Sequence, residues 1–297
     1  MAITSTTTIT TLQEKVIGAA RLTLKDDVLA IKSSFQVQRG RPGMDDTYNS
    51  PKLPGVTAVG LTEGVDMVSE SMTDTNVAVS ATEVGVSVEL TNKMLRTVHG
   101  EEFMRKAGVA MGSAINVKQE QDLATLIDGF SNVVGLDGSS GTLGQLGAGL
   151  AQLRNNSEPI SEAMFRKVSA VLHPYTWHDI SQQLFPTGSG DAHAPMTAQT
   201  NGKSGDVMDK YFPVGRYFNT PVKVSTNLVT SSNDVRNGIW HEDAGLMYEF
   251  MPATLEVDDS DKSMRSKELS MVIDYGYGEL NDGFGREWDT DATAPTS

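Results

Sequence analysis

The fold of this chain is decided by residues 82–129, which read TEVGVSVELTNKMLRTVHGEEFMRKAGVAMGSAINVKQEQDLATLIDG. Apolar residues alternate with small or polar ones from Val84 to Leu90, which is the period of a half-buried strand. From Glu101 onward the apolar and small residues recur at spacings of four and three, as they do on one face of a helix. These residues are Phe103, Ala107, Ala110, Ala114 and Val117. We therefore expect a strand, then a helix of about 28 residues and roughly 40 Å that ends before Gly129 and packs this stripe against a sheet.

The composition describes a chain that can fold but has no thiol chemistry. Of its 297 residues 38% are hydrophobic, which is enough for a core, and none is cysteine. Disulfides, thiolate metal sites and a cysteine nucleophile are thereby excluded. Residues 1–11 lack the basic start and apolar core of a signal peptide, and no run approaches the roughly 20 apolar residues of a membrane span. We expect a protein that folds inside the cell and has no membrane partner.

The net charge of −14 argues against a general nucleic-acid binder, because affinity for duplex DNA comes mainly from Lys and Arg contacts to phosphate. The charge is also unevenly distributed. Residues 53–90 contain six acidic residues and no basic one, and residues 234–297 contain fifteen acidic residues against five basic ones. If this protein meets DNA, we expect the contact to be weak and non-specific.

Two clusters suggest metal sites, and both fail on spacing. His173 and His178 are separated by five positions across an expected helix start at Pro174, which places them on different faces. In the acidic run 258–261, Met264 stands where a calcium-binding EF-hand loop needs its glycine. No serine elbow, His-Asp pair or paired carboxylates stand out. We predict no enzyme activity, no cofactor and no metal, with a hydrolase that has a mobile loop at 185–206 as a less favoured alternative.

The chain divides into segments of different character, of which 53–92 is an extended hairpin. Its apolar phase slips by one residue near Glu83, so a bulge or bend is expected there. The hairpin has too few large apolar residues for a core of its own, and an isolated two-stranded ribbon is marginally stable in water. It must therefore lie on another surface.

The order of the segments resembles that of tailed-bacteriophage major capsid proteins with the HK97 fold, an α+β fold. The resemblance assigns residues 1–52 to an N-terminal arm, 53–92 to the hairpin called the E-loop, and 93–130 to a peripheral domain with a long spine helix. It assigns 131–233 to the axial domain and 234–297 to the return strands and C-terminus. The motifs that support it lie at residues 61–64, 84–91, 118–129, 172–174, 219–222 and 275–278.

This resemblance implies a structural protein of the virion whose copies form hexamers and pentamers of an icosahedral shell around double-stranded DNA. It also implies assembly in the host cytoplasm, a portal at one vertex and room for a decoration protein. Because the arm is too short to contain a scaffolding domain, we expect a separate scaffolding protein. An encapsulin nanocompartment shares the fold and remains an alternative, although the first tryptophan here is Trp177 and the usual Trp-containing N-terminal helix is not evident.

The resemblance also suggests how neighbouring subunits meet. In this family the hairpin lies over an adjacent subunit, so its acidic residues could pair there with the basic residues around the start of the spine helix. The acidic candidates are Glu63, Asp66 and Glu70, and the basic ones are Lys93, Arg96, Arg105 and Lys106. Some family members link an E-loop lysine to a neighbour's asparagine. Residues 53–90 contain no lysine, so we expect no such isopeptide bond.

Overall fold

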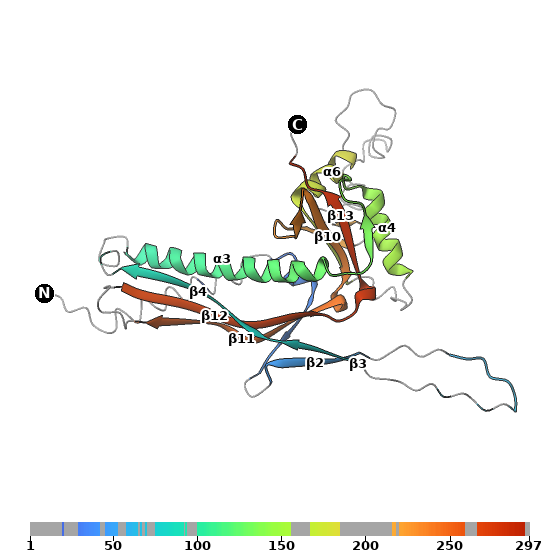
Figure 1. The fold of residues 1–297 in the computed structure, drawn as a ribbon, viewed down its shortest axis with the longest axis horizontal. Helices are drawn as coiled ribbons and strands as arrows, with labels where there is room; N and C mark the ends of the chain where they lie inside the picture. Colours follow the sequence, from blue (N-terminus) through green and yellow to red (C-terminus); the bar gives the residue numbers. More distant parts are fainter. Residues whose placement is uncertain are drawn as a thin grey trace, which may run out of the picture.

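The computed structural model describes residues 29–41, 45–52, 58–64, 75–91, 100–155, 167–184, 216–217, 220–258 and 266–294, and the single residues 20, 66, 69 and 93. In these residues one long helix lies along a four-stranded sheet, and a second sheet with two helices stands at one end of it (Figure 1). None of the described helices is long and apolar enough to cross a membrane.

The long helix is α3 (Gly100–Ile127), and its 28 residues match the predicted spine helix. Beneath it the strands follow the order β1 (Gln36–Arg39), β11 (Gly245–Asp258), β12 (Ser266–Glu279) and β4 (Thr82–Thr91). Strand β4 is the predicted alternating strand: Leu90 is buried, and Val84, Val86 and Val88 pack against the same core. The local pattern therefore predicted both elements correctly.

The face that α3 buries was predicted wrongly. Phe103 is 43% exposed and Val117 is 39% exposed, Ala110 and Ala114 are exposed, and Ala107 is only half-buried. The buried face lies on the other side of the helix and packs with Leu269, Met271 and Ile273 of β12. It is formed mainly by Met104, Met111, Ile115, Leu123 and Ile127. Buried glycines, amides and Glu120 interrupt its apolar period, whereas alanines, which are strong helix formers, give the outer face an apolar appearance.

The hairpin ladder consists of β2 (Thr47–Lys52) and β3 (Thr75–Ser80), which pair antiparallel. Its outgoing strand therefore begins before residue 53, within the predicted arm. The break in phase predicted near Glu83 is confirmed and lies at Ala81, two residues before it. At Ala81 the chain leaves the β2–β3 ladder, and β4 continues in the four-stranded sheet beside β12. The odd-numbered apolar residues before Ala81 therefore belong to the hairpin, and the even-numbered ones after it belong to the four-stranded sheet.

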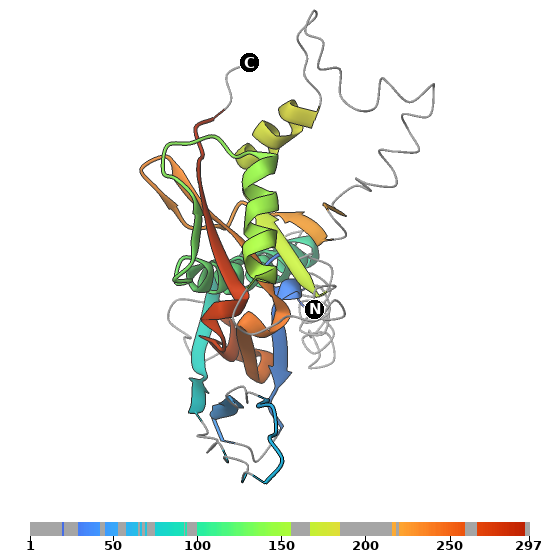
Figure 2. The same ribbon diagram turned by 90° about the vertical axis from the view of Figure 1, so that its right-hand side faces the viewer.

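The second sheet has the order β5 (Val133–Gly135), β13 (Gly285–Asp291), β10 (Asp234–His241), β6 (Val168–Leu172), β8 (Thr220–Val224) and β7 (Arg216–Tyr217), with β9 (Thr230–Ser231) paired to β10. Helix α4 (Leu143–Arg154) packs on this sheet, as Figure 2 shows, and α6 (Pro174–Leu184) follows β6. The sequence patterns at 168–172 and 222–225 each predict a strand, and both strands are present. The helix start expected at Pro174 is also confirmed.

The sequence pattern at 269–277 predicts a final strand, which is part of β12, but η3 (Asp282–Phe284) and a further strand, β13, follow it. The C-terminal part thus returns to the second sheet and does not end in the first. The two sheets meet where α3 ends, and glycines permit the close approach. A β-carbon on Gly238 would lie 2.5 Å from the side chain of Ile127, and one on Gly285 would lie 2.4 Å from the ring of Phe130.

Candidate assembly surfaces

A buried carboxylate of α3 binds the described part of the N-terminal arm. Glu120 is 2% exposed and accepts hydrogen bonds from the backbone N–H groups of Ile31 and Lys32, each at 3.0 Å. The hydroxyl of Ser225 donates to the same carboxylate at 3.3 Å. Burial raises the pKa of Glu120, and these hydrogen bonds oppose the shift by stabilising the charged form. The arm, the spine helix and the residue after β8 are therefore joined at one carboxylate.

A lysine completes this junction from the strand β8. The Lys223 ammonium donates to the hydroxyls of Ser33 and Ser34, each at 2.8 Å, and burial lowers its pKa. The residues that hold the arm were missed by the sequence analysis, because Glu120 does not belong to the helix stripe that was predicted to be buried.

The described arm residues also contribute to the core. The ring of Phe35 stacks on Trp240 with centroids 4.8 Å apart, and Ile31 is fully buried. Lys32 pairs with Glu249 of β11, and β1 (Gln36–Arg39) adds a parallel strand to that edge. Residues 29–39 of the predicted arm 1–52 are therefore part of the body of the subunit, held from within the molecule.

The base of the hairpin is seated on β12 through two glycines. A β-carbon on Gly276 would lie 2.3 Å from the carbonyl oxygen of Ser80, and one on Gly278 would lie 2.7 Å from Val79. Val79 is 2% exposed and packs with Leu246 and Tyr248. The glycines of the 275–278 motif thus make room for β3 as it crosses the sheet.

Beyond its base the hairpin extends away from the body of the subunit, as the blue segment in Figure 1 shows. In the described segment 58–64, Val59 is 69% exposed and Leu61 is 73% exposed. A β-carbon added at Gly60 or Gly64 would meet nothing within 4 Å. The apolar side chains of this segment are therefore uncovered by the described residues of their own chain.

The predicted acidic and basic partners lie apart in one chain. Glu63 and Asp66 are exposed on the hairpin, whereas Arg105 and Lys106 are exposed on the first turns of α3, at the opposite end of the long axis (Figure 1). Lys106 pairs with Glu102 of its own helix at 2.9 Å. Lys93 is exposed, and Glu70 and Arg96 lie outside the described residues. Pairing of Glu63 or Asp66 with Arg105 or Lys106 would therefore need a second copy of the chain.

The outer face of α3 combines the apolar stripe that was predicted to be buried with these bases. Phe103 and Val117 mark its two ends, with the exposed Ala110 and Ala114 between them. Single exposed apolar residues are normal on a protein surface, but here several of them recur along one face of a helix. The subunit therefore exposes two apolar surfaces, one on the hairpin and one on α3.

No protein-family model and no curated protein matches this chain. Solved structures match it over most of its length. The chain is similar to the capsid of Ralstonia phage GP4, with 14% identity, a TM-score of 0.61 and 88% of each chain covered. It is similar to the capsid structure of Cyanophage P-SCSP1u, with 10% identity, a TM-score of 0.61, and 88% of this chain and 87% of the other covered.

A third similar structure is the head of Helicobacter pylori bacteriophage KHP40, with 10% identity, a TM-score of 0.62, and 90% of this chain and 92% of the other covered. The chain has the fold of these capsid subunits, which is the HK97-like α+β fold, and the predicted fold class is confirmed.

Proposed function

We propose that this chain is the major capsid protein of a tailed bacteriophage, and that its copies form hexamers and pentamers of an icosahedral shell around double-stranded DNA. The near full-length likeness to phage capsid chains supports this function. The role is structural and belongs to the virion. Buried contacts between the arm, the spine helix and both sheets hold the subunit together, as a rigid building block of a shell requires.

The single observation that supports assembly most directly is the exposure of Val59 and Leu61 on a hairpin that leaves its own subunit. Fully burying a side chain of this kind contributes about 1.5–3 kcal/mol. A neighbouring copy can supply the cover, because α3 presents an apolar outer face with Arg105 and Lys106 near one end. Since the same contact repeats at every subunit of a symmetric assembly, a modest contribution per copy can decide whether a shell closes.

The test is a double variant, Val59→Ser with Leu61→Ser, compared with Thr62→Ser as a matched control on the same segment. Because the two side chains are exposed within the subunit, we expect the thermal unfolding temperature of the unassembled protein to stay unchanged. The yield of particles seen by electron microscopy should fall for the double variant and not for the control. Normal particle yield from the double variant would show that the hairpin residues are not buried by assembly.

The charged residues give a second, independent test by reciprocal charge reversal. Glu63→Lys or Arg105→Glu alone should lower particle yield, and the combination should recover part of it. Each exposed pair contributes only about 0.2–1 kcal/mol, so the recovery should be largest at low salt. If the double variant is no better than the singles, apolar and backbone contacts hold the hairpin instead.

The remaining partners follow from the same proposal. We propose a portal, a separate scaffolding protein, and a surface that can accept a decoration protein, with assembly in the host cytoplasm. Each copy of the chain in the shell has a net charge of −14, which favours weak and non-specific contact with the packaged DNA. Nucleic acid inside native particles would distinguish this function from that of an encapsulin shell, which would contain protein cargo.

A further inference from the structure

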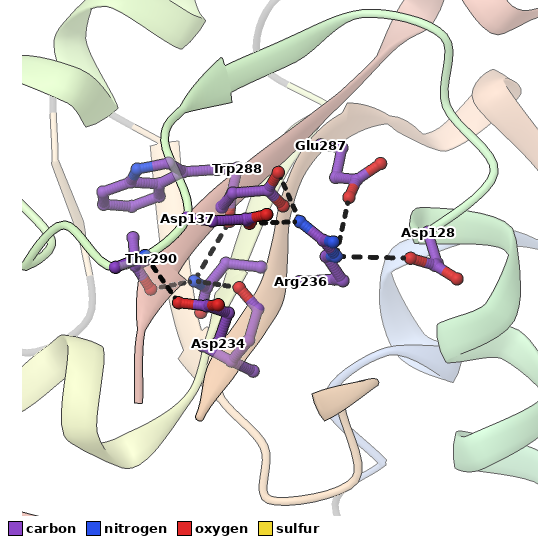
Figure 3. A network of polar contacts seen from close by, with 11 residues as sticks. Asp128, Asp137, Asp234, Arg236, Glu287, Trp288 and Thr290 are labelled. Atoms are coloured by element: carbon purple, nitrogen blue, oxygen red, sulfur yellow. Dashed lines mark hydrogen bonds and ion pairs between the residues drawn. The ribbon is translucent and has the colours of Figure 1, made fainter. Parts of the chain in front are cut away.

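A guanidinium at the meeting point of the two sheets is surrounded by four carboxylates, as Figure 3 shows. Arg236 of β10 lies 3.5 Å from Asp128, just after α3, and 2.9 Å from Asp137, in the loop after β5. It also pairs with Glu287 at 3.3 Å and with Asp289, both on β13. The cluster therefore connects the end of the spine helix, a loop and the second sheet. Its four carboxylates outnumber its single guanidinium.

The four carboxylates differ in their access to water. The side chains of Asp128 and Asp137 are 46% and 61% exposed, so solvent screens their charge. The side chains of Glu287 and Asp289 are only 7% and 11% exposed. These two residues are two positions apart on one strand, opposite Gly238 and Arg236, so they share a face. Two buried carboxylates side by side cannot both ionise without a large energetic cost.

An unpaired oxygen indicates how this cost is avoided. One carboxylate oxygen of Asp289 accepts from Arg236, while the other, Oδ1, is buried and has no hydrogen-bond partner. Glu287 stands beside Asp289 on the same face of β13, and both carboxylates pair with Arg236. A proton between the two carboxyl groups would supply a donor to Asp289 and remove one of the buried negative charges.

We propose that Glu287 is protonated at neutral pH and donates to Asp289, which makes the Arg236 cluster a pH-sensitive latch between the spine helix and the second sheet. This inference concerns the single subunit and does not depend on the proposed function. Loss of the proton leaves four negative charges around one positive charge. Asp128 and Asp137, which have water available, are the groups that can move away from the cluster.

Burial, and then the neighbouring Asp289, raise the pKa of Glu287 to about 8. The folded state therefore keeps a proton that the unfolded chain releases above about pH 4.5, so stability falls as the pH rises through this interval and levels off above about pH 8. Of the other charged groups in the cluster, Asp128 also raises this pKa, whereas the positive charge of Arg236 lowers it. Asp234 and Asp291, opposite each other two positions further along the two strands, accept hydrogen bonds from the backbone N–H groups of Gly138 and Thr293.

The first test compares the full-length protein with Glu287→Gln, whose amide can donate to Asp289 but cannot titrate. Between pH 6 and pH 8 we expect the folded-to-unfolded ratio of the wild type to fall by up to about tenfold per pH unit relative to the variant. Glu256→Gln, a variant of an exposed glutamate on β11, should keep the wild-type slope. Equal slopes for the wild type and Glu287→Gln would overturn the proposal.

Hydrogen exchange tests the latch itself. At pH 9, residues 128–139 should exchange several-fold faster in the wild type than in Glu287→Gln, whereas at pH 6 the two proteins should exchange equally. Comparing proteins at the same pH removes the intrinsic pH dependence of exchange. Equal exchange at pH 9 would contradict a latch.

Infrared spectroscopy keeps the proposal testable if Glu287→Gln does not fold. The wild type should show a protonated-carboxyl band that disappears with a midpoint near pH 8, and Asp289→Asn should move that midpoint to lower pH. A wild type without such a band, or an unmoved midpoint, would overturn the proposal.

Discussion

The seat of the hairpin on β12 makes Gly276→Ala the most informative substitution for the fold. The added β-carbon would lie 2.3 Å from the carbonyl oxygen of Ser80, 2.8 Å from its carbonyl carbon and 3.1 Å from the nitrogen of Ala81. All three atoms are backbone, so no side-chain rotation can relieve the clash. Overpacking of this kind costs about 1–3 kcal/mol. Because β3 must move, the buried Val79 would also lose contact with Leu246 and Tyr248.

The matched control is Gly85→Ala in β4, where a β-carbon would meet its nearest neighbours only at 3.4 Å. In urea denaturation we expect Gly276→Ala to lower the free energy of unfolding by about 1–3 kcal/mol. Gly85→Ala should change it by less than about 0.5 kcal/mol, as at an ordinary exposed position. Particle yield should fall only for Gly276→Ala, because the hairpin then leaves the subunit in a different direction. Equal stability of the two variants would refute the seating of β3 on β12.

Three further predictions follow from other parts of the subunit. Ala110→Trp, on the exposed face of α3, should change the free energy of unfolding by less than about 0.5 kcal/mol. Met111→Ala, on the buried face, should lower it by about 2–5 kcal/mol in the same assay. The reverse order would mean that the stripe containing Ala110 is the buried face. Glu120→Leu leaves the backbone N–H groups of Ile31 and Lys32 without their acceptor, so it should cost at least about 1–3 kcal/mol and speed limited proteolysis within residues 29–41. An unchanged cleavage rate would show that Glu120 does not hold the arm. Denaturing gels of mature particles should show a monomer near 31.9 kDa, and a ladder of covalent multimers would contradict the absence of isopeptide bonds.

The elements that the sequence predicted correctly have local and regular patterns. Strand β4 alternates over a full strand length, α3 is long and uninterrupted by proline, and the buried strand 168–172 is followed by a proline at the first turn of a helix. Strand β13 was missed for a physical reason. Arg286, Glu287 and Asp289 are all buried in it, so its sequence has neither apolar alternation nor an apolar run.

The contacts that join the segments could not be predicted, because they depend on residues far apart in the chain. Ile31 and Glu120 are separated by 89 positions, and neither residue type identifies the other as its partner. Which face of α3 is buried could not be predicted for the same reason. Two faces of α3 carry small or apolar residues, and only the sheet beneath it decides which one is buried. For the hairpin, the lack of a core implies cover from another surface, and this cover stays a prediction, because Val59 and Leu61 are exposed in the single chain.

A cryo-electron microscopy reconstruction of particles formed by the full-length chain tests the central claim most directly. The proposed function predicts closed shells built from rings of five and six copies, in which Val59 and Leu61 of each hairpin are covered by a neighbouring copy. Particles in which the hairpin folds back on its own subunit, or a preparation that yields only monomers under all assembly conditions, would contradict it.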